Sequence, residues 1–158
     1  MNKKTLSSLM EWIRPGGIGI VLFCSFAFGD DAIARFHLLG PFIVLIMSGT
    51  VAFESLFLGD VGSEKIGYAP NRAYQIQSGL ANAAIALTAL LVFLLNWGRF
   101  AEATIVTAML LFFTFSGANH LATAILQHNF KPVNLLRPAM ALLLVAFLVP
   151  PLIQALQP

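Results

Sequence analysis

Four polar side chains stand inside otherwise apolar stretches of this chain: Glu54, Asn82, Asn119 and His120. A carboxylate and an imidazole can exchange a proton, and carboxamides can hold a polar group by donating and accepting hydrogen bonds. Inside a membrane such side chains are rare, because hydrocarbon solvates them poorly, and they mark either functional sites or helix contacts. Their meaning therefore depends on the elements that carry them.

Those elements are predicted to be membrane-spanning helices. The chain has 158 residues, of which 58% are hydrophobic and only 10% charged, with a mean hydropathy of +0.84, whereas a soluble domain carries about 25% charged residues. The charges are also segregated, and long runs without them do not alternate as barrel strands would. We predict an all-α integral membrane helical bundle that forms a single transmembrane domain over residues 1–158. The runs without Asp, Glu, Lys or Arg are 38–53, 73–98, 103–127 and 138–158.

About five transmembrane helices are expected, and the first is open to a second interpretation. Only fifteen uncharged residues separate Arg14 from Asp30, and Lys3 and Lys4 before an apolar core also fit a signal peptide with Ala27-Phe28-Gly29 as its cleavage site. Charge favours a span. With five spans, seven of the nine basic residues share the N-terminal side, whereas four spans would divide them five against four. The positive-inside rule then predicts the N-terminus inside and the C-terminus outside. The predicted spans are about 12–31, 38–58, 76–96, 103–126 and 135–156.

In this topology the four polar residues fall in one layer, roughly 6–10 Å below the cytoplasmic surface at a rise of 1.5 Å per residue. Each also has a structural explanation. Asn82 lies in a small-residue face that is typical of close helix packing, and Glu54 can pair with Lys65 or Arg72 near the interface. His120 needs partners for both ring nitrogens. If Glu54 and His120 meet, the pair would relay a proton or hold a polar headgroup.

Other functional classes lack their motifs. His120 and His128 are eight residues apart, and Cys24 is the single cysteine, so no metal-ligand spacing is present. The sequence contains no phosphate loop, nucleophile elbow or dinucleotide fingerprint, and its nine Lys and Arg form no nucleic-acid footprint. We expect no metal, no cofactor and no nucleic-acid partner, and we assign no catalytic residue.

Two segments resemble the signatures of a family of small bacterial multi-pass membrane proteins of unknown function. Ile66-Gly67-Tyr68 and the run from Tyr74 to Asn82 resemble its "IGW…FQxExGxAN" motif. Gly117-Ala118-Asn119-His120 and the run from His128 to Asn134 resemble its "GAxxGH…GNfxPgN" motif. Tyr68 replaces a Trp and Gln77 replaces a Glu of the pattern, and the family's Asp near the start of the last helix has no counterpart around Arg137-Pro138.

The resemblance implies a bacterial inner-membrane location but no activity. It adds Tyr74, Gln75 and Gln77 to the expected ligand-binding residues, and the cations that rim the same face add Arg72. The first functional hypothesis is a non-enzymatic bundle that binds a lipid or small amphiphile, or passes a small solute, through a cytoplasm-facing polar pocket. The alternatives are a membrane enzyme with a His120–Glu54 acid–base pair, and a structural subunit that packs against itself or a partner membrane protein.

Overall fold

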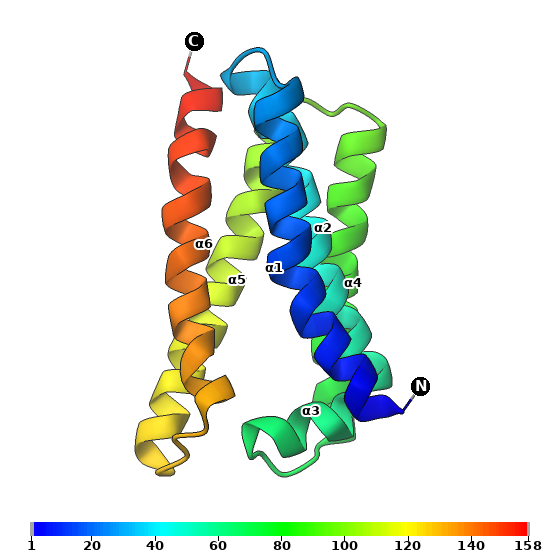
Figure 1. The fold of residues 1–158 in the computed structure, drawn as a ribbon, viewed down its shortest axis with the longest axis vertical. Coiled ribbons are helices and arrows are strands. Elements are labelled where there is room, and N and C mark those ends of the chain that lie inside the picture. The colour runs from blue at the N-terminus through cyan, green and yellow to red at the C-terminus, as the bar shows by residue number, and fades with distance from the viewer. Residues whose placement is uncertain (1, 158) are drawn as a thin grey trace.

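The computed structural model describes residues 2–157, and these form six helices and no strands (Figure 1). Five of the helices are long enough and apolar enough to cross a membrane, as predicted. The helix α1 begins and α6 ends at opposite ends of the bundle (Figure 1), as an odd number of crossings requires. The helices are α1 (Lys3–Phe28), α2 (Ala32–Phe57), α3 (Gly59–Ile66), α4 (Arg72–Leu94), α5 (Arg99–Leu126) and α6 (Pro132–Leu156).

Each long helix begins before the apolar run that predicted it, and polar caps explain three of these starts. The side chain of Asn2 accepts a hydrogen bond from the backbone N–H of Thr5. Asp31 caps α2 and Asn71 caps α4 in the same way. Because a capping side chain satisfies an N–H that the first turn leaves free, it fixes the helix start independently of hydropathy.

The short helix α3 lies between the predicted spans 38–58 and 76–96. Asp60 in its first turn and Lys65 in its last turn oppose the helix macrodipole. Gly67 ends the helix in the left-handed conformation, with φ 79°, which glycine adopts without a Cβ clash. In Figure 1, α3 lies across one end of the bundle, which we call the α3 end; the opposite end is the far end.

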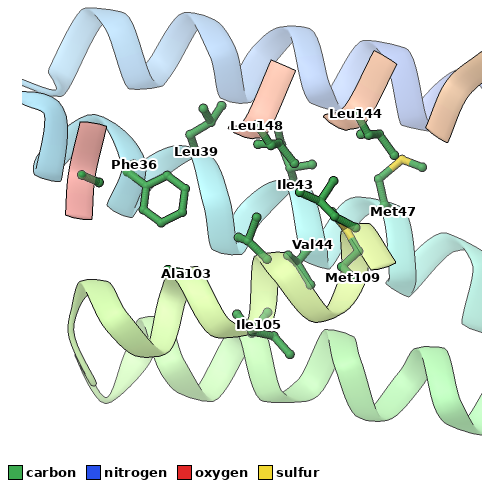
Figure 2. Packing of buried hydrophobic residues seen from close by; sticks show 14 residues of the cluster. Phe36, Leu39, Ile43, Val44, Met47, Ala103, Ile105, Met109, Leu144 and Leu148 are labelled. Atoms are coloured by element: carbon green, nitrogen blue, oxygen red, sulfur yellow. The ribbon is translucent and has the colours of Figure 1, made fainter. Parts of the chain in front are cut away.

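The long helices form two groups that share one hydrophobic core. The first group contains α1, α2 and α4, and the second contains α5 and α6. Figure 2 shows Phe36, Ile43 and Met47 of α2 packed among residues of α5 and α6, including Met109 and Leu148. Phe36, Ile43, Met109 and Leu148 lie in the helix halves nearer the far end, and Met47 lies just past the middle of α2. Toward the α3 end the two groups diverge (Figure 1), and polar side chains replace the apolar core there.

Candidate functional site

A network of four polar side chains connects α5, α6 and the segment after α3. Nδ1 of His120 lies 2.7 Å from Oδ1 of Asn134 and 3.0 Å from the hydroxyl of Tyr68. Nε2 of His120 lies 2.8 Å from Nη1 of Arg137. We call Tyr68, His120, Asn134 and Arg137 the His120 cluster. His120 and Asn134 are buried, whereas Arg137 is exposed.

The hydrogen bonds of the His120 cluster determine the state of its imidazole. A guanidinium only donates, so Nε2 of His120 accepts the bond from Arg137 and carries no proton. The amide of Asn134 donates through Nδ2 to the carbonyl of Asn129 at 3.1 Å, which leaves Oδ1 turned toward the imidazole as an acceptor. Nδ1 of His120 therefore carries the proton and donates it to Asn134. The imidazole is neutral, so it does not offset the positive charge of Arg137.

Close packing of α5 on α6 places these residues. A Cβ added at Gly117 would lie 3.1 Å from the Cα of Pro138 and 3.3 Å from the Cβ of Ala141, so only glycine allows this approach without a shift. One turn later, His120 faces the first turns of α6, where Asn134 and Arg137 share a helix face at a spacing of three residues. The sequence thus combines a small residue on α5 with a polar pair on α6.

A second polar group lies on α1 and α2. The guanidinium of Arg14 forms a salt bridge with Glu54, and its Nε donates to Oγ1 of Thr50 at 2.9 Å. Ser7 donates to the other carboxylate oxygen of Glu54 at 3.3 Å. Glu54 therefore offsets the charge of Arg14. The Arg14–Glu54 pair belongs to the first helix group and the His120–Arg137 contact to the second.

Glu54 and His120, two of the predicted site residues, do not form a hydrogen bond with each other. Glu54 binds Arg14 and Ser7, and His120 binds only members of the His120 cluster. Asn119, next to the buried His120 on α5, is exposed. Asn82 is buried and donates to the carbonyl of Ser78, one turn earlier in α4, at 2.9 Å, whereas its Oδ1 has no hydrogen-bond partner within residues 2–157.

The remaining predicted residues lie at the start of α4 and point in different directions. Gln75 is buried and donates to Ser63 of α3 at 3.1 Å. Arg72 is exposed, and its guanidinium donates to the carbonyls of Ser55 and Leu56 at the end of α2. Tyr74 and Gln77 are exposed. The structure therefore places Gln75 and Arg72 in helix-to-helix contacts.

Sequence reasoning missed the partners of His120 and Glu54. Arg137 and Arg14 read as ordinary positive-inside residues, and Asn134 as part of a loop signature. A usable signal was present, because a buried histidine requires two partners and Asn134 and Arg137 stand three residues apart at the start of a spanning helix. The structure supplies the packing of α5 on α6 that brings these helices together.

A further buried pair lies at the far end. His37 of α2 forms a salt-bridge contact with Glu102 in the first turn of α5, and its ring stacks on Phe93 with centroids 4.8 Å apart. The Glu102 side chain is 2% exposed. The sequence alone did not identify this pair. Within residues 2–157, no three His, Cys, Asp or Glu side chains lie together as metal ligands would.

The five apolar helices, with ion pairs and a histidine network at their ends, define a multi-pass membrane protein with an all-helical bundle. The chain belongs to a family of unknown function (DUF6790), whose model matches residues 31–157, so the predicted membership of an uncharacterised family is confirmed. The match contains the whole His120 cluster and leaves Arg14 outside it. No curated protein and no solved structure matches the chain.

Proposed function

We propose that this protein binds an anionic amphiphile, whose charged group contacts Arg137 at the α3 end of the bundle. The observation that carries the proposal is the state of Arg137. Arg137 lies within a spanning helix and is exposed. No carboxylate in residues 2–157 lies within salt-bridge distance of it. An ionised side chain within a membrane-spanning helix supports the hypothesis of a functional site.

The guanidinium of Arg137 is oriented as well as charged. One of its donors is held by Nε2 of His120, and a guanidinium has five N–H groups in a planar fork. The remaining donors are available to a ligand. A fork of this kind binds a carboxylate or phosphate group through two parallel hydrogen bonds. Asn134 holds His120, and His120 thus sets the direction of the Arg137 guanidinium before a ligand binds.

The membrane and its orientation are part of the proposal. Seven basic residues lie toward the α3 end and two, Arg35 and Arg99, lie toward the far end. The positive-inside rule supports an α3 end that faces the cytoplasm, and the sequence resemblance supports a bacterial inner membrane. The partner is then a lipid or small amphiphile of the cytoplasmic leaflet.

The alternatives have less support. An acid–base pair of His120 and Glu54 requires the two groups to act on one reacting centre, but each is engaged by its own arginine. A subunit that packs through glycine faces requires those faces to be free. Inside this chain Gly79 packs against Leu56 and Gly117 against Pro138, so both glycines already serve contacts between its own helices.

Binding of dodecyl phosphate tests the proposal. We expect the purified protein in dodecyl maltoside micelles to bind this amphiphile, and Arg137→Gln to lower the affinity by about ten- to a hundredfold, as the loss of a charge-assisted contact implies. Arg72→Gln is the matched control, because Arg72 is also exposed but contacts backbone carbonyls of α2. Equal affinity of Arg137→Gln and the unmodified protein would refute the proposal.

The orientation has its own experiment. Single cysteines at Lys4 and Gln157, in a Cys24→Ser background, report the side of each end when intact cells are treated with a membrane-impermeant maleimide. We expect labelling at residue 157 alone in intact cells, and at both positions after permeabilisation. Labelling of residue 4 in intact cells would place the α3 end outside and contradict the proposed orientation.

A further inference from the structure

We infer that the ligand of Arg137 is a membrane lipid with an anionic headgroup, and that it enters from the bilayer between the two helix groups while α3 closes the aqueous end. The inference rests on the proposed function, and it selects between two sources of the same oxyanion chemistry. One source is a phosphate or carboxylate on a lipid, and the other is a free anion in water.

The first observation is that α3 is attached to the first helix group. Lys65 forms a salt bridge with Glu11 of α1, with an Nζ–Oε1 distance of 2.6 Å. Lys4 lies 3.6 Å from Glu64, although both side chains are largely exposed and such a pair contributes little. Gln75 of α4 adds a hydrogen bond to Ser63. Together these contacts hold α3 on α1 and α4.

The second observation is that the connection between α5 and α6 also holds the C-terminal half of α3. Asn129 donates to the carbonyl of Ile66 at 2.8 Å, and Lys131 donates to the carbonyl of Glu64 at 2.9 Å. Tyr68, directly after α3, joins the His120 cluster. Contacts with both helix groups thus hold α3 across the end of the bundle (Figure 1).

The third observation is that the sides of the bundle are not closed in the same way. Within residues 2–157, the backbone of α1 lies close to α2 and α3 and farther from α5 and α6. The shared core ends before the α3 end, where the two groups diverge (Figure 1). Arg137 is exposed, and the inferred route to it is from the lipid side.

The depth of Arg137 fits a headgroup. It is five residues beyond Pro132, the first residue of α6, which places it roughly 7 Å along the helix. The headgroup region is about 5–7 Å thick on each side of the hydrocarbon core. Arg137 therefore lies near the boundary between headgroups and acyl chains. Its neighbours on α6 are apolar and exposed, including Leu136 and Leu143, as contact with acyl chains requires.

Immobilising α3 distinguishes the two routes. In a Cys24→Ser background, Glu11→Cys and Lys65→Cys allow a short bis-methanethiosulfonate reagent to join α1 to α3 at the site of their salt bridge. Dioleoyl phosphatidic acid and inorganic phosphate are the two probes, and binding to protein in phosphatidylcholine nanodiscs is measured before and after crosslinking. The variant with Lys65→Cys alone, treated with the same reagent, is the control for the modification.

We expect crosslinked and reduced protein to bind phosphatidic acid with affinities within about twofold, and inorganic phosphate at a hundredfold excess not to displace it. A tenfold or greater loss of lipid binding on crosslinking, reversed by reduction, would overturn the inference, because it would show that the ligand passes α3. Displacement by inorganic phosphate would also overturn it. Arg137→Gln separates the two proposals: if this variant binds phosphatidic acid as well as the unmodified protein does, the proposed function itself fails.

Discussion

Arg137 of α6 donates a hydrogen bond to Nε2 of His120 on α5 over 2.8 Å. This contact makes the histidine an acceptor, and Asn134 on the other ring nitrogen completes the assignment of a neutral imidazole. A protonated histidine would instead place two cations in contact. The pair therefore carries one positive charge at the α3 end, and this charge is on Arg137, the more exposed of the two residues.

Replacing His120 tests the hold on Arg137. In His120→Leu, Asn134 loses the imidazole donor and Arg137 loses its acceptor, so we expect the free energy of unfolding to fall by about 1–3 kcal/mol. The affinity for dodecyl phosphate should fall as well, because the guanidinium is no longer oriented. Unfolding in mixed SDS and dodecyl maltoside micelles, followed by circular dichroism, measures the first effect.

The neighbouring residue provides the control for His120. Asn119→Leu makes a comparable change on the exposed face of the same turn, and a surface change of this kind alters stability by less than about 0.5 kcal/mol. If both variants unfold alike and bind dodecyl phosphate alike, His120 does not position Arg137.

Gly117 tests the packing of α5 on α6. In Gly117→Ala the new methyl group would lie 3.1 Å from the Cα of Pro138, and backbone atoms at such a contact cannot rotate away. We expect a loss of about 1–3 kcal/mol in the free energy of unfolding, measured in the same micelle mixture. Gly19→Ala is the matched control. It also lies in a helix, but its Cβ would meet no atom within 4 Å, so we expect a gain of up to about 1 kcal/mol from helix propensity. A Gly117→Ala protein as stable as Gly19→Ala would contradict the close approach.

Hydropathy and charge predict most of this fold, because the spacing of charges along the chain is itself set by the bilayer. The five long helices follow from runs such as 103–127, and the clustering of Lys and Arg predicts which ends lie together. The helices capped by Asp31 and Asn71 start earlier than the predicted spans, because a side-chain cap acts locally and does not alter the average hydropathy. The helix α3 escaped prediction because eight residues with one acid at the start and one base at the end resemble a polar linker.

The candidate site was only partly predictable for a different physical reason. Depth along a helix follows from residue number, so His120 and Glu54 were correctly expected near one end. The direction of a side chain around the helix depends on which neighbour it packs against, and two helices of similar hydropathy do not reveal this. Glu54 therefore contacts Arg14 of α1, and His120 contacts Asn134 and Arg137 of α6. The hypothesis from the sequence was instead a pair of Glu54 and His120.

The salt bridge between Arg14 and Glu54 makes a prediction about pairs. Both side chains are about one-fifth exposed, so removing one partner leaves a poorly hydrated charge. We expect Glu54→Gln and Arg14→Gln each to lower the free energy of unfolding by about 1–3 kcal/mol. The double variant should lose less than the sum of the two, and the difference is the coupling energy of the pair. Strict additivity in the micelle unfolding assay would show that the two side chains act independently.

The pair of His37 and Glu102 predicts where stability resides at the far end. The Glu102 side chain is 2% exposed and forms a salt-bridge contact with His37. His37→Phe keeps an aromatic ring for stacking on Phe93 but removes that partner, so we expect a loss of about 3 kcal/mol, typical of a buried charge left unpaired. His37→Phe combined with Glu102→Gln removes the charge too and should recover at least half of the loss. Binding of dodecyl phosphate should be unchanged in both, because Arg137 lies at the other end of the bundle. If the double variant is no more stable than His37→Phe alone, the loss comes from packing, and the ionic contact is not what joins α2 to α5.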